Sequence, residues 1–478
     1  MKRKFFISVM VCVICITAFA GTIPVFAAES PGGTYALSSA GEYLDTFVNY
    51  VDGYQLQVDA GMSVDMSYGG VGAVLESSTK RIEIYKQDIS ATSTAGYINY
   101  SNKFLSNTYD HVTTYNNWVE INDRDVKVTE WYRGKLAKVP NDKNYYICLE
   151  IPQGSSVYTV FVKSSVPIES YRYLAEHFSV FAPTAAPYMR SSAAVDLETR
   201  GWNDETLAFY LRYFGADSEL TWGIFEPDTA NFSYNQIDYY RNYFDYDFPI
   251  WLNYSEVENT YKHPNLKNRL DAAYAHGAVL ELTLQTRAAE GNLVYSILNG
   301  NYDAFLYDYA KVIAEHGHPV MFRLFNEMNG DWCPYSSYNT SKDTMVFKEV
   351  YQYVYNIFEE TGANANTIWV WNPNSVSFPN FDWNHPLMYY PGDDYVDVVG
   401  MTAYNTGNYY PGETWREFDA LYRGMYYNYC SWFKQPFMIT EFASATAGGN
   451  KARWIENMFS SIDEFEGIKV AIWWDGCD

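Results

Sequence analysis

The feature that most constrains the fold is a repeated alternation of strand-like and helix-like segments from residue 204 onward. Eight short runs are rich in apolar residues, and longer amphipathic segments separate them. The runs lie at residues 220–226, 249–254, 278–285, 320–326, 367–372, 396–404, 436–442 and 469–475. Most are apolar throughout, as expected for strands that are buried on both faces. Eight such units over roughly 270 residues predict an α/β fold, a (β/α)8 TIM barrel.

The segments between these runs show helical periodicity. Apolar residues recur at spacings of three and four between Val346 and Phe358, and the pattern stops at Gly362. A second such segment, residues 265–277, also stops at a glycine. No helix pattern follows the eighth run before Asp478, so the sequence leaves open which segment covers that side of the barrel.

The preceding part of the chain has a different texture. Residues 28–190 contain short runs of alternating apolar and polar residues, which predict a smaller α+β accessory domain with a mainly antiparallel sheet. We expect a hairpin turn at residues 121–124 and helices within residues 91–107 and 167–182. Residues 182–201 carry small residues and two prolines without hydrophobic period, so we place the barrel domain at residues 191–478.

The first 27 residues resemble a secretory signal peptide. Three basic residues precede an apolar run, and small residues before a cleavage point after Ala27 suit a signal peptidase. A membrane anchor is the alternative, but Gly21 and Pro24 interrupt the run and it is short for a span. We therefore expect a secreted, extracellular protein with no membrane partner after cleavage.

Charge narrows the range of partners. The formal net charge is -24, and it becomes -27 when Lys2, Arg3 and Lys4 leave with the signal peptide. Such a surface repels nucleic acid and anionic membranes, so a neutral partner is favoured. Aromatic residues make up 18% of the chain, with 46 Tyr and 14 Trp. Their flat apolar faces and polar tips suit sugar rings, although an aromatic-rich core is the alternative explanation.

Four cysteines remain beyond the signal peptide. Cys148, Cys333, Cys430 and Cys477 have neither CxxC spacing nor nearby histidines, so we expect no metal site. Outside the cell they could form up to two disulfides, with three possible connectivities.

Two glutamates end strand-like runs on opposite sides of the predicted barrel. Glu327, in the segment FRLFNEMNGDW, ends the fourth run, and Glu441, in MITEFASA, ends the seventh. Functional groups of such barrels lie where strands end, so the two carboxyl groups can converge on one cavity. A protonated and an ionised carboxyl group are what glycoside cleavage requires, and a separation of about 5 to 5.5 Å makes the second a nucleophile.

The segment from Arg323 to Trp332 resembles the acid/base motif of glycoside hydrolase family 26. That family is known chiefly for endo-β-1,4-mannanases and also for some β-glucanases and β-xylanases. The later segments TIWVWNPN, YVDVVGMTAYN and PFMITEF resemble its fifth, sixth and seventh strands, in the same order. The resemblance implies a retaining enzyme with Glu327 as acid/base and Glu441 as nucleophile.

The same resemblance implies further site residues. Tyr404 would hydrogen-bond the nucleophile, and Arg323 would lie beneath it and keep it ionised. Trp332 and Trp473 would be platforms for sugar rings, although Trp474 could be the inward ring instead of its neighbour. For Trp222 and Trp371, core packing is the better interpretation.

One residue departs from the family pattern. Asn326 stands where family 26 usually has histidine, and an Asn-Glu pair is similar to the wider clan A of retaining β-glycosidases. In that clan the asparagine hydrogen-bonds the sugar's 2-hydroxyl, which is axial in mannose and equatorial in glucose and xylose. Gln285 lies near a position where many mannanases have histidine. These two departures leave the substrate open: the family resemblance makes mannan the first choice, with β-glucan or β-xylan as alternatives.

Other interpretations of the glutamates remain. Each could pair with Arg323 in a purely structural role, and the protein could be a non-catalytic glycan-binding surface protein. Hydrolysis by two carboxyl groups needs no cofactor. We expect no cofactor. We also expect a monomer, with a polysaccharide as its partner.

Overall fold

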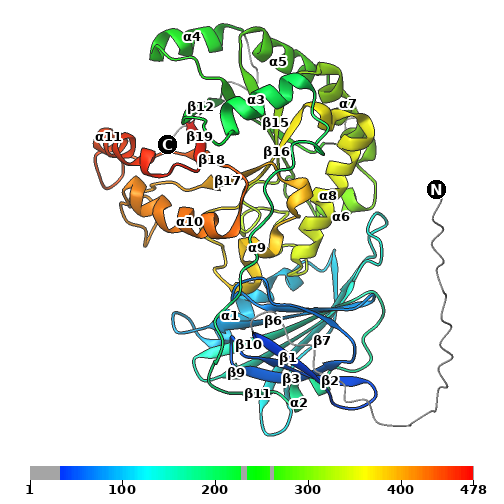
Figure 1. Cartoon of the computed structure of the whole chain (residues 1–478). Coiled ribbons are helices and arrows are strands. Elements are labelled where there is room, and N and C mark those ends of the chain that lie inside the picture. Colours follow the sequence, from blue (N-terminus) through cyan, green and yellow to red (C-terminus); the bar gives the residue numbers. More distant parts are fainter. Residues whose placement is uncertain (1–32, 228–233, 259–262, 477–478) are drawn as a thin grey trace, which may run out of the picture.

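The computed structural model describes residues 33–227, 234–258 and 263–476. The chain forms an N-terminal part built from antiparallel sheets and a C-terminal barrel that packs against it (Figure 1). The expected signal peptide lies outside the described residues. None of the helices that the structure describes has both the length and the apolar character needed to cross a membrane.

The N-terminal part contains two antiparallel sheets rather than one. The smaller has the order β1 (Tyr35–Ser39), β2 (Leu44–Asn49), β3 (Tyr54–Asp59) and β11 (Ser179–Val180). The larger has the order β4 (Ser63–Asp65), β5 (Ala73–Glu76), β6 (Lys80–Asp88), β10 (Ser156–Ser164), β9 (Tyr145–Gln153), β8 (Asp125–Arg133) and β7 (His111–Glu120). Alternate residues of both sheets, such as Leu56 and Val160, are buried in one shared core. The expected antiparallel character is confirmed.

The predicted hairpin turn at residues 121–124 and the predicted helix within residues 91–107 are confirmed. The β7–β8 hairpin turns at Asn122 and Asp123, whose φ angles of 49° and 57° suit a two-residue turn. Helix α1 (Thr94–Ser101) begins after Ser93, whose side chain accepts a hydrogen bond from the amide of Gly96.

The helix predicted at residues 167–182 is wrong. Only one turn forms, α2 (Tyr173–Glu176), and residues 179–180 then pair with β3 as strand β11. The backbone of residues 179–180 pairs with the edge of the smaller sheet instead of continuing the helix. This pairing partner lies more than a hundred residues away in sequence, so local periodicity could not indicate it.

The C-terminal part is a closed barrel of eight parallel strands, as predicted. Its strands are β12 (Thr221–Phe225), β13 (Ile250–Glu256), β14 (Val279–Gln285), β15 (Val320–Leu324), β16 (Thr367–Trp371), β17 (Val398–Thr402), β18 (Phe437–Phe442) and β19 (Ile468–Trp474). Pairing of β12 with β19 closes the barrel. Each strand overlaps the apolar run that predicted it.

Helices surround the barrel (Figure 1). They are α4 (Tyr234–Phe244), α5 (Pro264–Ala275), α6 (Leu293–Leu298), α7 (Asp303–His316), α8 (Thr344–Thr361), α9 (Pro386–Tyr389), α10 (Phe418–Trp432) and α11 (Lys451–Ser461). Short 3₁₀ turns lie at Lys103–Ser106, Ala363–Asn366, Asp382–Asn384, Asp393–Tyr395 and Ile462–Glu464. Helix α3 (Asp204–Phe214) precedes the first strand, and its Tyr210 and Phe214 pack with Ile250 and Val470 at the end where the strands begin.

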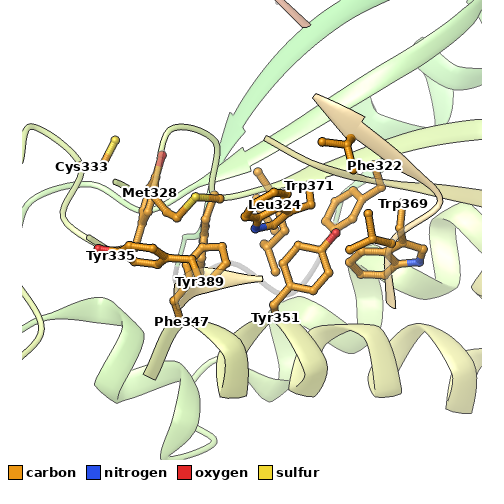
Figure 2. Close-up of a cluster of buried hydrophobic side chains, with 14 of the residues drawn as sticks. Phe322, Leu324, Met328, Cys333, Tyr335, Phe347, Tyr351, Trp369, Trp371 and Tyr389 are labelled. Carbon is orange, nitrogen blue, oxygen red and sulfur yellow. The ribbon is translucent and has the colours of Figure 1, made fainter. Parts of the chain in front are cut away.

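Side chains along β15 alternate between the core outside the barrel and the interior of the barrel. Phe322 and Leu324 point outward and pack with Trp369 and with Phe347 and Tyr351 of α8 (Figure 2). Met321 instead belongs to the apolar cluster inside the barrel, and Arg323 shares that inner face. The strand therefore delivers a buried arginine to the barrel interior.

The two parts share a buried polar interface. Lys163 of β10 donates to Asp343 Oδ1 at 2.6 Å, and Tyr146 of β9 donates to Asp343 Oδ2 at 2.9 Å. His111 Nε2 lies 2.8 Å from Ser341 Oγ. Asp343 and Ser341 belong to the loop between β15 and α8, so the larger N-terminal sheet holds the loop that follows Glu327.

Candidate active site

Glu327 and Glu441 both lie at the mouth of the barrel where the strands end. Glu441 is on β18, and Glu327 follows β15 by three residues. Asn326 connects the two strands, because its Nδ2 lies 3.4 Å from Glu441 Oε1. The negative charge of Glu441 is close enough to raise the pKa of Glu327. Both carboxyl groups therefore lie close together at the same end of the barrel.

The backbone after β15 has an unusual shape. Phe325 and Glu327 both have a φ of 54°, in the left-handed region that side chains other than glycine rarely adopt. The amide of Glu327 donates to the carbonyl of Asn372 at 2.7 Å, and that of Phe325 donates to Leu284 at 3.0 Å. Each such residue costs about 1–3 kcal/mol, so these neighbouring strands must hold the turn in place. Strain of this kind is common at functional sites.

Glu441 is surrounded by donors. Arg323 Nη1 lies 2.6 Å from Glu441 Oε1, and the hydroxyl of Tyr404 donates to Glu441 Oε2 at 2.7 Å. Arg323 is itself fixed within the barrel, because it donates from Nε to Thr283 Oγ1 at 2.7 Å and from Nη1 to Asn372 Oδ1 at 2.9 Å. The two donors therefore fix the orientation of the Glu441 carboxyl group.

Glu327 also accepts hydrogen bonds, but its pKa is raised. Burial, followed by the negative charge of Glu441, raises its pKa to about 7. Asn374 Nδ2 donates to its Oε1 at 2.7 Å and Trp332 Nε1 to its Oε2 at 3.1 Å, and both bonds lower the pKa without cancelling the effect of burial. A carboxyl group that holds its proton near neutral pH can act as a general acid.

The structure brings together most of the residues that the sequence singled out. Arg323, Asn326, Tyr404 and Trp332 each contact one of the two glutamates. Asn326 also accepts a hydrogen bond from Gln285 at 2.6 Å through its Oδ1.

Trp473 requires correction. Its ring packs outward against Phe442 at 5.2 Å, within the core between the barrel and its helices. The inward ring on β19 is Trp474, which stacks on Phe225 at 5.2 Å and lies 6.0 Å from Tyr404. Alternation along β19 sets this arrangement, because Val470 and Ile472 also face inward. The platform assigned to Trp473 is therefore wrong.

The two tryptophans expected to favour core packing do so. Trp371 is fully buried beside Tyr390 and Phe433. Trp222 packs against Phe442 and Phe459 outside the barrel.

Several site residues were missed from the sequence. Tyr254 lies 3.3 Å from Arg323 Nη2, and Asn372 and Asn374 bond Arg323 and Glu327. Glu281 is fully buried, and its Oε1 lies 3.6 Å from Arg323 Nε. Burial, followed by the charge of Glu441, raises the pKa of Glu281 to about 7, although Arg323 opposes this. Glu281 is the one charged residue in the apolar run 278–285, and this feature of the sequence could have indicated it.

The described cysteines carry no disulfide. Cys148, Cys333 and Cys430 are free thiols, and Cys477 lies outside the described residues. Within the described ranges, no cluster of three or more His, Cys, Asp or Glu side chains could hold a metal ion.

Comparison with known proteins bears on this arrangement. Residues 287–447 match the profile of glycosyl hydrolase family 26. The matched span contains Arg323, Glu327, Tyr404 and Glu441. The part of the barrel that contains both glutamates is therefore similar to glycosyl hydrolase family 26. The resemblance seen in the sequence motifs is thereby confirmed.

Two curated relatives of this chain differ in name. Endoglucanase H of Acetivibrio thermocellus is 35% identical over 209 residues, which are 42% of this chain and 22% of that protein. A mannan endo-1,4-beta-mannosidase of Bacillus subtilis is 28% identical over 171 residues, which are 35% of this chain and 41% of that protein. The chain thus spans less than half of either relative.

A solved structure of Bacillus subtilis mannanase man26 is also similar to this chain. It is 20% identical, with a TM-score of 0.43, and the similarity covers 59% of this chain and 89% of that one.

Proposed function

We propose that the protein is an endo-β-glycosidase that hydrolyses a neutral β-linked polysaccharide, with a mannan-type polysaccharide as the first candidate. The observation that carries this proposal is the unequal environment of two neighbouring glutamates. Donors and a buried arginine surround Glu441, whereas burial raises the pKa of Glu327 to about 7. The match to family 26 over residues 287–447 and the mannosidase relative support it.

The proposed reaction is a double displacement with retention of configuration. Glu441 Oε attacks the anomeric carbon while Glu327 gives its proton to the departing glycosidic oxygen. Glu327, then ionised, removes a proton from water, which attacks the anomeric carbon and releases Glu441. Tyr404 and Arg323 hold the attacking carboxylate in position.

A β-glucan is the second candidate substrate, and two observations favour it. Asn326 replaces the usual histidine beside the acid/base, and its Nδ2 lies beside Glu441, where a 2-hydroxyl would be recognised. The relative with the higher identity is named an endoglucanase. An equatorial 2-hydroxyl would then meet this amide.

Release of reducing sugar from soluble mannan, β-glucan and xylan, measured side by side, tests the proposal. Wild type should act on one of these, and Glu327→Ala should abolish the release. No release from any of the three would favour the non-catalytic glycan-binding alternative. The anomeric form of the first product, followed by NMR, should be β if configuration is retained.

We further propose that the protein is exported through its N-terminal signal. The basic residues and apolar run of residues 1–27 support this. The N-terminus of protein recovered from the culture medium should be Ala28. Recovery of the uncleaved chain in the membrane fraction would contradict the proposal.

A further inference from the structure

Four exposed aromatic rings lie on or against the loops that follow β14, β15 and β16, and two of them come from the N-terminal part. They are Trp332, Phe378, Tyr100 and Tyr109, with exposed fractions of 50%, 45%, 37% and 69%. We call these four rings the aromatic rim. Large exposed rings next to a functional site are a common mark of a binding surface.

The rim begins at the acid/base itself. Trp332 Nε1 donates to Glu327 Oε2 at 3.1 Å, so this ring is fixed to the carboxyl group. Its centroid lies 5.4 Å from that of Phe378, whose amide donates to the carbonyl of Asn329 at 2.8 Å. These two rings belong to the loops that follow β15 and β16, so both lie on the mouth side of the barrel.

Tyr100 extends the rim from helix α1 of the N-terminal part. Its hydroxyl donates to Asp331 Oδ2 at 2.5 Å, and Asp331 directly precedes Trp332. Its ring contacts Tyr338 at 5.2 Å and Phe381 at 6.1 Å, in the same two barrel loops. Helix α1 lies on the side of the N-terminal part that faces the barrel (Figure 1).

Tyr109 rests on the third loop at the mouth. A Cβ atom at Gly291 would lie 2.7 Å from Tyr109 Cε1, so the ring lies directly on a residue that has no side chain. The neighbouring Asp110 accepts a hydrogen bond from the amide of Asn292 at 2.9 Å. This loop follows β14, whose last residue, Gln285, bonds Asn326. The ring is thus held in place while most of it remains in solvent.

We propose that the aromatic rim binds additional sugar rings of the polysaccharide beyond Glu327, and that the N-terminal part therefore supplies part of the substrate-binding surface. This inference rests on the proposed function for the identity of its ligand. It assigns Tyr100 and Tyr109 as sugar-binding residues.

The chemistry of the rim favours a neutral sugar chain as the occupant. Tyrosine and tryptophan offer an apolar face together with a polar edge, as sugars do. The net charge of -24 repels anionic partners but not an uncharged chain. Rings already held in place lose little freedom on binding. Trp332 joins the rim to Glu327, so one polysaccharide chain can contact both.

Affinity can be tested in native gels that contain soluble galactomannan or soluble β-glucan. The full-length chain carries Glu441→Gln so that the polysaccharide is not degraded. Adding Tyr109→Ala should weaken the retardation, with a dissociation constant raised about 3- to 10-fold by loss of one stacking ring. Tyr109→Phe keeps the ring face and should preserve affinity. Tyr43→Ala, which removes an exposed ring in the β1–β2 turn, should have no effect.

Kinetics of the otherwise wild-type chain provide the second readout. Tyr109→Ala should lower kcat/KM for the polysaccharide by a similar factor and leave that for a chromogenic β-bioside unchanged, because the short substrate does not reach Tyr109. Unchanged retardation, or an equal loss on both substrates, would overturn the inference. Tyr109-dependent binding by a chain that hydrolyses no polysaccharide would support the rim and refute the proposed hydrolysis.

Discussion

The guanidinium of Arg323 lies between Glu441 and Glu281. Its Nη1 is 2.6 Å from Glu441 Oε1, and its Nε is 3.6 Å from Glu281 Oε1. All three side chains are buried. One positive charge is therefore shared between a carboxylate at the mouth and a carboxyl group deeper in the barrel. Because the pKa of Glu281 is raised to about 7, the protonation state of this carboxyl group changes near neutral pH.

Glu281→Gln tests this arrangement through stability. The folded protein holds the Glu281 proton more tightly than the unfolded chain does, so the free energy of unfolding should fall as pH rises from about 4.5 to about 7. A shift of this size corresponds to about 3 kcal/mol. Urea unfolding at pH 4.5 and pH 8 should show a smaller fall in the variant. An identical fall in both proteins would show that Glu281 is ionised throughout.

The pH dependence of catalysis should report Glu327. The acid must be protonated in the first step, so kcat/KM should decline as pH rises through about 7. Asn374→Ala removes a donor to the carboxylate form, which raises the pKa of Glu327 and should move this limb to higher pH. Trp332→Phe removes the other donor and should act in the same direction. A limb that stays in place or moves down would contradict this assignment.

Tyr404→Phe should impair catalysis more than stability. A hydrogen bond to a charged group contributes about 1.5–3 kcal/mol, so kcat should fall about 10- to 100-fold. Thermal unfolding should change little, because the ring remains. Tyr409→Phe, on the exposed loop that follows β17, is the matched control and should retain full activity. Equal kcat in both variants would remove Tyr404 from the mechanism.

The buried link between the two parts should be essential for stability. Lys163 pairs with both Glu83 and Asp343, and Lys163→Met would leave these buried carboxylates without that cation. The expected loss is about 3–5 kcal/mol in urea unfolding. Lys138→Met breaks a more exposed pair with Asp303 across the same interface and should cost about 1 kcal/mol or less. Equal losses would show that burial does not govern these pairs.

The barrel could be predicted because its signal is local. Strands buried on both faces are apolar throughout, and each of the eight runs carries that character within its own residues. The segment at residues 167–182 failed because its last residues pair with β3, far away in sequence. The N-terminal core similarly divides between two sheets, which alternation within single strands does not reveal.

Prediction of the site depended on the kind of information required. Glu327 and Glu441 could be singled out as candidates because each lies at the end of an apolar run. The choice between Trp473 and Trp474 required the register of β19, and β18 and β19 pair with irregular register. The left-handed backbone at Phe325 and Glu327 has no signature in residue type, because neither residue is glycine.

The most direct test of the account is to identify the residue that forms the covalent intermediate. An activated 2-deoxy-2-fluoro-β-glycoside of the preferred sugar should inactivate the enzyme, and peptide mass spectrometry should find one glycosyl group on Glu441. Inactivation should be absent in Glu441→Gln. A label on another residue, or rapid hydrolysis of polysaccharide with no trapped intermediate and with inverted product, would contradict the assignment of Glu441 as nucleophile and Glu327 as acid.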